Sequence, residues 1–147
     1  MREDKGNLWT YPGVAVRVVT TNGVVKNNGA LVMGRGCAQQ LRDSMPGVDL
    51  MLGQHVRKNG NVPCRIALPG RPFDIWTMPV KHKWDEPADI DLIRLSATKM
   101  MRLARTYGVG NVVIPRPGCG NGQLQWSTVR HELSPILDDR FIAITFK

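Results

Sequence analysis

The chain of 147 residues is poor in cysteine, in aromatic residues and in long hydrophobic runs. Its three cysteines, Cys37, Cys64 and Cys119, include no CxxC pair, which argues against a disulfide framework or a zinc knuckle and indicates reduced thiols in the cytoplasm. No apolar run is long enough to cross a bilayer, and the charged start MREDKGN lacks the apolar segment of a secretion signal. No spacing of His, Cys, Asp or Glu is typical of a metal site. We therefore expect one domain over 1–147, without membrane contact, metal or cofactor.

Positive charge is in excess, with a formal net charge of +8 at pH 7. Such an excess favours an anionic ligand or partner, and nucleic acid, a nucleotide or a phosphorylated metabolite would each fit. The lysines and arginines are scattered along the chain rather than gathered in one tract. A basic surface that only keeps the protein soluble is therefore the alternative interpretation.

Predicted strands and helices alternate along the chain. Strands are expected at 14–20, 64–68, 73–80, 111–114 and 140–146, and helices at about 37–45, 49–59, 88–107 and 127–137. This alternation predicts a three-layer α/β/α domain around a mixed, mostly parallel central sheet. Ligands of such sheets bind outside the carboxyl ends of the strands, which is where the glycine-rich turns of this chain fall.

Two glycine-rich turns precede predicted helices. The first is Gly34-Arg35-Gly36, and the second places Gly118, Gly120 and Gly122 within the stretch from Ile114 to Trp126, IPRPGCGNGQLQW. Backbone N–H groups converge at such a turn and the helix dipole favours an anion, so each turn is either a phosphate cradle or a tight structural turn. The spacing matches neither the dinucleotide fingerprint nor a Walker A motif. Two such turns in one small domain favour a bound diphosphate.

The same segments resemble four motifs of the macro domain family. Lys5 to Trp9 (KGNLW) is similar to its opening KGD element, and Val32 to Ala38 (VMGRGCA) is similar to its first phosphate loop. Met78 to Trp84 (MPVKHKW) resembles an FPTKxHW segment, and Pro115 to Trp126 resembles the second phosphate loop. The resemblance covers nearly the whole chain, and the nearest branch is that of the terminal ADP-ribose protein glycohydrolases and the DNA ADP-ribosyl glycohydrolase antitoxins.

The resemblance implies an ADP-ribose site. Both glycine turns would hold the diphosphate, Asn7 and Leu8 would face the adenine, and Asn22 would reach the distal ribose. Either Trp126 or Phe146 would flank the cleft. The expected binding residues are Asn7, Leu8, Asn22, Gly34, Arg35, Gly36, Cys37, Gly118, Cys119, Gly120, Asn121, Gly122 and Gln123.

Three positions depart from the family pattern that the resemblance implies. The first is Asn7, which stands where the family usually has an aspartate that accepts from the adenine amino group. Its amide oxygen can still accept but brings no charge, so this contact is expected to be weaker. Arg42 stands where a catalytic lysine of the first helix is expected, and arginine is a poor nucleophile or base. Gly122 stands where the protein-directed branch has an aspartate, whereas the DNA-directed branch carries glycine there. The usual catalytic groups are thus missing, and Arg42 is expected to be a solvated helix residue or a contact to phosphate.

The remaining candidates for catalysis are Asn22, Lys26, Lys81 and His82. A lone loop histidine such as His82 is equally well explained as an exposed residue, although it would titrate near neutral pH. Cys119 lies between glycines near a predicted helix N-terminus, which would lower its pKa, or it is simply a small residue that fits a tight turn.

Three functions remain open from the sequence. The first is a monomeric macro domain that binds ADP-ribose, free or attached to nucleic acid or protein, with weak or no hydrolase activity. The second is an ADP-ribosyl glycohydrolase that uses a rearranged base, and the third is sequestration of a signalling nucleotide derived from NAD.

Overall fold

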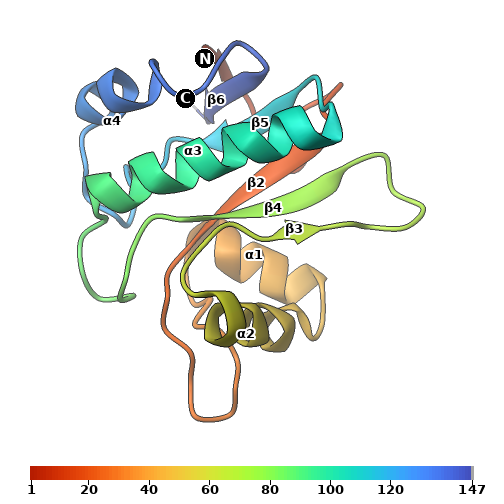
Figure 1. Ribbon diagram of the computed structural model, residues 1–147, viewed down its shortest axis with the longest axis vertical. Helices are drawn as coiled ribbons and strands as arrows, with labels where there is room; N and C mark the ends of the chain where they lie inside the picture. Colours follow the sequence, from red (N-terminus) through yellow and green to blue (C-terminus); the bar gives the residue numbers. More distant parts are fainter. Residues whose placement is uncertain (147) are drawn as a thin grey trace.

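Residues 1–146, which the computed structural model describes, are organised around one six-stranded sheet with helices on both faces (Figure 1). All neighbouring strands are parallel except the last pair, in which the two strands run antiparallel. This arrangement confirms the predicted three-layer α/β/α fold with a mixed, mostly parallel sheet. In spatial order the strands are β1 (Arg2–Lys5), β6 (Phe141–Thr145), β5 (Val112–Pro115), β2 (Val16–Thr21), β4 (Asp74–Pro79) and β3 (Arg65–Ile66).

Helices cover both faces of the sheet, as Figure 1 shows. Helices α3 (Ile90–Tyr107) and α4 (Trp126–Leu133) lie on one face, and α1 (Gly36–Ser44) and α2 (Val48–Asn59) lie on the other. Successive side chains of a strand point to opposite faces. In β2, Val16 and Val18 accordingly pack into the core beneath α3, while Val19 packs into the core beneath α1 and α2.

Helix α3 is long because its ends are capped and its inner face is continuous. The Asp89 side chain accepts a 2.9 Å hydrogen bond from the Asp91 amide, which satisfies one free N–H group of the first turn. Gly108 closes the other end in the left-handed conformation that glycine adopts without strain. Ile93 and Met100 are fully buried between these ends.

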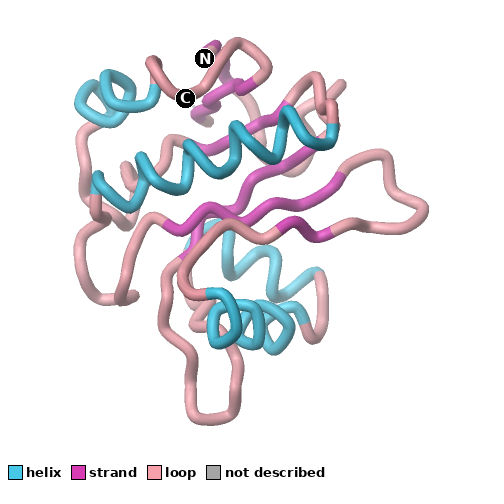
Figure 2. The backbone as a smooth tube through the Cα atoms, viewed as in Figure 1, coloured by secondary structure: helices cyan, strands magenta, loops and turns pink. Residues whose placement is uncertain are grey.

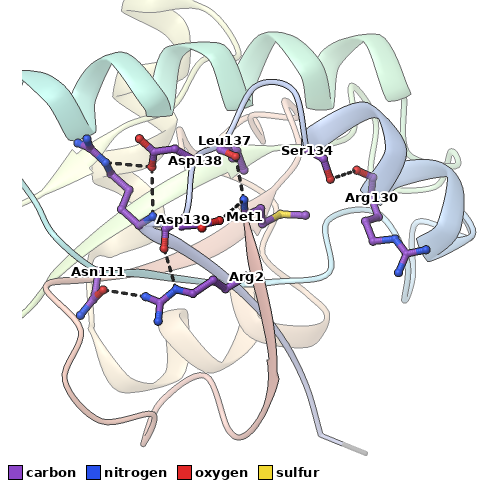
Figure 3. Close-up of polar contacts among 9 residues, drawn as sticks. Met1, Arg2, Asn111, Arg130, Ser134, Leu137, Asp138 and Asp139 are labelled. Atoms are coloured by element: carbon purple, nitrogen blue, oxygen red, sulfur yellow. Dashed lines mark hydrogen bonds and ion pairs between the residues drawn. The ribbon is translucent and has the colours of Figure 1, made fainter.

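An N-terminal strand was not predicted from the sequence. Strand β1 reads REDK, and all four residues are exposed, so it carries no hydrophobic pattern. Pairing with β6 and side-chain contacts hold it in place: Arg2 donates hydrogen bonds to the Asp139 carbonyl at 2.7 Å and to the Asn111 amide oxygen at 2.9 Å (Figure 3). These contacts are non-local and cannot be read from the composition of the segment.

Several boundaries also differ from the prediction. Strand β5 extends to Pro115, one residue past the predicted end. Proline has no backbone N–H group to donate, but β2 pairs only with Val112 and Val113, so Pro115 lies beyond the hydrogen bonds between β2 and β5. Helix α2 begins at Val48, one residue before the predicted start at residue 49, and Gly47 is its N-cap residue. Helix α4 ends at Leu133, two residues before Pro135.

Candidate functional site

A cleft with a volume of about 640 Å³ opens at the carboxyl ends of four neighbouring strands. This is the crevice in which open α/β sheets bind ligands. The cleft crosses the sheet in the order β6, β5, β2 and β4. The lining residues at or directly after those strand ends are Thr145 and Phe146, Pro115 and Arg116, Thr20 and Thr21, and Val80 and Lys81.

The first glycine turn directs the start of α1 into this cleft. Gly36, Cys37 and Ala38, the first residues of the helix, all line it. The N-cap residue Arg35 makes no side-chain capping hydrogen bond, and no acidic residue lies in the first turn. The free N–H groups and the positive end of the helix dipole are therefore available to an anion in the cleft.

The second glycine turn is folded tightly on itself. The Leu124 amide donates to the Gly118 carbonyl at 2.9 Å, and a Cβ atom on Gly122 would lie only 2.5 Å from that same carbonyl oxygen. Gly118 also has a positive φ of 73°. A Cβ on Gly120, in contrast, would meet no heavy atom of residues 1–146 within 4 Å. Glycine is thus required by packing at Gly118 and Gly122, while Gly120 leaves open space at the cleft.

The two turns approach each other closely at the cleft. A Cβ atom added to Gly36 would lie 3.5 Å from the side-chain nitrogen of Asn121, which belongs to the second turn. Gly34, Gly118, Gly120 and Gly122 all contribute to the lining. The two segments are about 80 residues apart in the sequence, and the parallel sheet brings them to one edge.

The charge of the lining is entirely positive. Arg35, Lys81 and Arg116 line the cleft, and no aspartate or glutamate does so within the described residues 1–146. The Arg116 guanidinium lies 5.1 Å from the centre of the Trp126 ring, a cation–π contact that orients it. Lys81 is buried, and its Nζ donates to the Asn121 carbonyl at 3.0 Å and to the Trp84 carbonyl at 3.4 Å.

The two residues expected at the adenine are placed differently. Leu8 lines the cleft, and the buried Arg17 donates a 2.7 Å hydrogen bond to its carbonyl oxygen. Asn7 lies outside the lining residues, and its side-chain oxygen accepts from the Trp9 amide at 2.8 Å. The segment is therefore at the cleft, but the Asn7 side chain is engaged in a local turn.

Of the four candidate catalytic residues, the structure brings Asn22 and Lys81 to the cleft. The Asn22 amide is held by the Val32 carbonyl and the Val24 amide, both at 2.9 Å. Lys26 lies in the loop between β2 and α1, which projects away from the sheet (Figure 2). His82 is outside the lining, with its Nε2 2.9 Å from Asp89.

Three further expected residues do not line the cleft, namely Cys119, Gln123 and Trp126. The expected lowering of the Cys119 pKa is wrong: burial raises it to about 11, only partly offset by the charge of Arg116, and α4 begins only at Trp126. Gln123 has a positive φ of 65°. The Trp126 indole donates to Glu3 at 2.8 Å, whereas Phe146, the other aromatic residue proposed to flank the cleft, does line it.

Arg42, at the position where the resemblance implied a catalytic lysine, is also outside the cleft. Its guanidinium forms an ion pair with Asp43 at 3.5 Å. The prediction of a solvated helix residue is consistent with this placement.

Some residues of the cleft were missed from the sequence. Trp84 follows the end of β4 and is 48% exposed, and Gln40 lies one turn into α1. Helical spacing from Gly36 would have found Gln40, and the position of Trp84 beyond a strand end would have pointed to the cleft. Within residues 1–146 no group of three His, Cys, Asp or Glu side chains could hold a metal ion, and no helix is long and apolar enough to cross a membrane.

Comparison with known proteins agrees with this geometry. No protein-family model matches the chain. Two curated relatives named DNA ADP-ribosyl glycohydrolase, from Mycobacterium bovis and Mycobacterium tuberculosis, are each 28% identical over 108 residues, which is 69% of this chain. The chain spans about 30% of the length of these relatives.

Solved structures establish the macrodomain fold. The macrodomain of Mycobacterium tuberculosis DarG matches with a TM-score of 0.77 and 22% identity, over 97% of this chain and 95% of that one. The macrodomain of Thermus aquaticus DarG matches with a TM-score of 0.76 and 24% identity over the same fractions. Thermosipho africanus DarTG in complex with ADP-ribose has a TM-score of 0.73 and 20% identity, over 90% of this chain and 38% of that chain.

Proposed function

We propose that the cleft binds ADP-ribose, either free or as the end of an ADP-ribosylated molecule. The observation that carries this proposal is the meeting of two N–H-rich turns, Gly34 to Gly36 and Gly118 to Gly122, at one cleft whose lining holds no carboxylate among the described residues. A diphosphate fits such a site, because both turns offer backbone donors and Arg35 and Arg116 add positive charge. The structure of Thermosipho africanus DarTG in complex with ADP-ribose, which has the same fold, supports this choice of ligand.

The two ends of the cleft differ in polarity, and this difference orients the ligand. Leu8, Ile144 and Phe146 form an apolar end beside β6, which suits the flat adenine ring. Asn22 and Lys81 make a polar end beside β4, which suits the hydroxyl groups of the distal ribose. The diphosphate then spans the middle, between the two glycine turns.

Calorimetry with ADP-ribose, AMP and ribose 5-phosphate tests the binding proposal. We expect ADP-ribose to bind more tightly than either fragment, since only the whole ligand reaches both ends of the cleft. Undetectable binding of ADP-ribose at millimolar concentration would rule the proposal out. A competition experiment, in which cyclic ADP-ribose isomers displace bound ADP-ribose, tests the alternative that the protein sequesters a signalling nucleotide. That alternative requires one isomer to bind clearly more tightly than ADP-ribose.

A second function is favoured by the position of Lys81. Its ammonium group is buried at the polar end of the cleft, where the anomeric carbon of the distal ribose would lie. The curated relatives are named DNA ADP-ribosyl glycohydrolases. We infer that Lys81, rather than Arg42, is the catalytic group if the chain hydrolyses its ligand. In that reaction water supplies the hydroxyl group of the released ADP-ribose and a proton goes to the departing acceptor.

Release of ADP-ribose from a modified single-stranded oligonucleotide and from a modified peptide tests the second function. Lys81→Ala is expected to abolish release from whichever substrate is cleaved. Lys26→Ala and His82→Ala serve as comparisons, because both residues lie outside the cleft. Equal loss in all three variants, or no loss in Lys81→Ala, would remove Lys81 from the reaction.

We also propose that the chain acts as a monomer in the cytoplasm. One chain supplies the complete cleft, and the three cysteines, all free within the described residues, fit a reducing compartment. Light scattering at several protein concentrations tests the oligomeric state, and a mass that rises with concentration would contradict it.

A further inference from the structure

Trp84 lies at the mouth of the cleft with nearly half of its surface open to solvent. Its exposed fraction is 48%, although it lines the cleft together with buried residues such as Lys81 and Val80. Its backbone is fixed there, because the Lys81 ammonium donates a 3.4 Å hydrogen bond to the Trp84 carbonyl. A large exposed aromatic ring beside a ligand cleft is available for stacking.

Trp84 lies at the end of the cleft opposite Phe146. Phe146 follows β6 and Trp84 follows β4, and β5 and β2 separate these two strands. Three strand spacings correspond to roughly 14 Å. If the adenine occupies the end near Phe146, as proposed above, the distal ribose lies near Lys81, and anything attached to its anomeric carbon leaves the cleft past Trp84.

The two basic side chains that directly precede Trp84, His82 and Lys83, each lie close to a carboxylate. His82 Nε2 lies 2.9 Å from Asp89, and Lys83 Nζ lies 3.9 Å from Glu86. The segment therefore offers little free positive charge to a phosphate or to an acidic peptide. The indole ring is the group left to recognise what emerges from the cleft.

We propose that Trp84 stacks on the nucleobase to which ADP-ribose is attached, and that it thereby determines specificity for ADP-ribosylated single-stranded nucleic acid. This inference rests on the proposed binding of ADP-ribose. Every base offers a flat π-face, so the contact accepts any base that carries the modification. The net charge of +8 attracts a polyanion over longer range, while the ring makes the local contact.

The test compares three ligands on wild type and Trp84→Ala by calorimetry. They are free ADP-ribose, ADP-ribose joined to a base of a single-stranded oligonucleotide through a carbon linkage that cannot be hydrolysed, and ADP-ribose joined to a peptide by a stable triazole. Loss of stacking is expected to reduce the ratio of oligonucleotide affinity to ADP-ribose affinity about tenfold. The same ratio for the peptide should stay within about twofold of wild type.

Two further variants make the result specific to the ring. Trp84→Phe should restore most of the ratio, since phenylalanine also stacks. It should also reduce the quenching of tryptophan fluorescence that we expect the oligonucleotide to cause in wild type. Tyr107→Ala, which truncates an aromatic side chain that is 50% exposed outside the cleft, should leave all three affinities unchanged.

Three outcomes would overturn the inference. An equal loss for oligonucleotide and peptide would make Trp84 a general contact. An equal loss for all three ligands would place it in the ADP-ribose site itself, and no change in the ratio would remove it from recognition. If wild type fails to bind free ADP-ribose, the proposed function fails instead, and the two failures are therefore distinguishable.

Discussion

The Nζ atom of Lys81 lies 3.0 Å from the carbonyl oxygen of Asn121, so one side chain ties the end of β4 to the second glycine turn. The bond places the ammonium group at the polar end of the cleft. It also connects the segment after β4, which forms the polar end of the cleft, with the second glycine turn. Replacement of Lys81 is therefore expected to loosen the turn and, if Lys81 is the catalytic group as proposed above, to slow the reaction as well.

Lys81→Met should lower the rate of ADP-ribose release from a cleavable substrate by about a hundredfold or more, as is typical when a group that takes part in proton transfer or nucleophilic attack is lost. Hydrogen exchange of residues 118–122 should become faster in the same variant, because the bond to Asn121 is gone. Lys83→Met is the matched control, since Lys83 is exposed and outside the cleft. Faster exchange without slower release would make Lys81 a structural tie only.

Valine substitutions at Gly34 and Gly120 should block the ligand without harming the fold. A Cβ at either position meets no atom of the residues that the structure describes within 4 Å, and both positions line the cleft with backbone angles that other residues adopt. We expect ADP-ribose affinity to fall at least about tenfold in calorimetry, while the free energy of unfolding changes by less than about 0.5 kcal/mol. Gly110→Val adds the same side chain in open space away from the cleft and should change neither quantity. Unchanged affinity in both cleft variants would argue against a ligand between the turns.

Cys119 should react slowly with iodoacetamide at neutral pH. Burial raises the pKa of its thiol to about 11, so the reactive thiolate is scarce until the pH approaches that value. In the unfolded chain the thiol ionises nearer pH 9, so unfolding releases its proton in this range. The thiol's contribution to stability is therefore complete below about pH 9 and is lost as the pH rises toward 11. Peptide mapping by mass spectrometry measures the rate, with the urea-unfolded protein as control, and equal rates in both states would contradict the burial of Cys119.

Asp89 links the N-terminus of α3 to the segment that carries Lys81 and Trp84. Its side chain accepts from His82 and from the Asp91 amide, both at 2.9 Å, and these two bonds hold the pKa of the carboxyl below its ordinary value. Asp89→Ala should lower the free energy of unfolding by about 1 kcal/mol at pH 7, the usual effect of losing an N-cap.

The pH dependence of this effect has a defined sign. Because the pKa of Asp89 is lowered on folding, the contribution of the carboxylate is complete above about pH 4 and is lost as the pH falls through the lowered value. Urea unfolding of wild type and Asp89→Ala between pH 2 and pH 7 measures the difference. Asp85→Ala, in the same segment, is the control, and a difference that grows toward acid pH would contradict the assignment.

The parts of the fold that depend on local pattern could be predicted from the sequence. The apolar spacing of α3 and the β-branched run of β2 can be recognised in the sequence. The alternation of predicted strands and helices, which implies a parallel sheet, can be recognised there as well. Strand β1 could not be predicted, since its four exposed residues are held by pairing with β6 and by contacts of Arg2 with distant residues. Information of this kind is absent from the segment itself.

The site divides in the same way. Glycine spacing located both turns. The rule that ligands bind outside the carboxyl ends of parallel strands placed both turns at one edge of the sheet. What the sequence could not give is the state of single side chains: Asn7 is engaged with Trp9, His82 with Asp89, and Lys81 with Asn121. Each of these bonds depends on the folded backbone. Two of them engage Asn7 and His82 outside the cleft lining, and the third holds the Lys81 ammonium group at the polar end of the cleft.

The close approach of Gly122 to Gly118 constrains how this cleft can change in evolution. Any side chain at Gly122 would collide with the backbone of its own turn. A single substitution of Gly122 by aspartate or glutamate would therefore require the turn to change its backbone conformation. Descendants of this chain that gain a carboxylate in the cleft would have to place it on a different segment, or first acquire a longer turn.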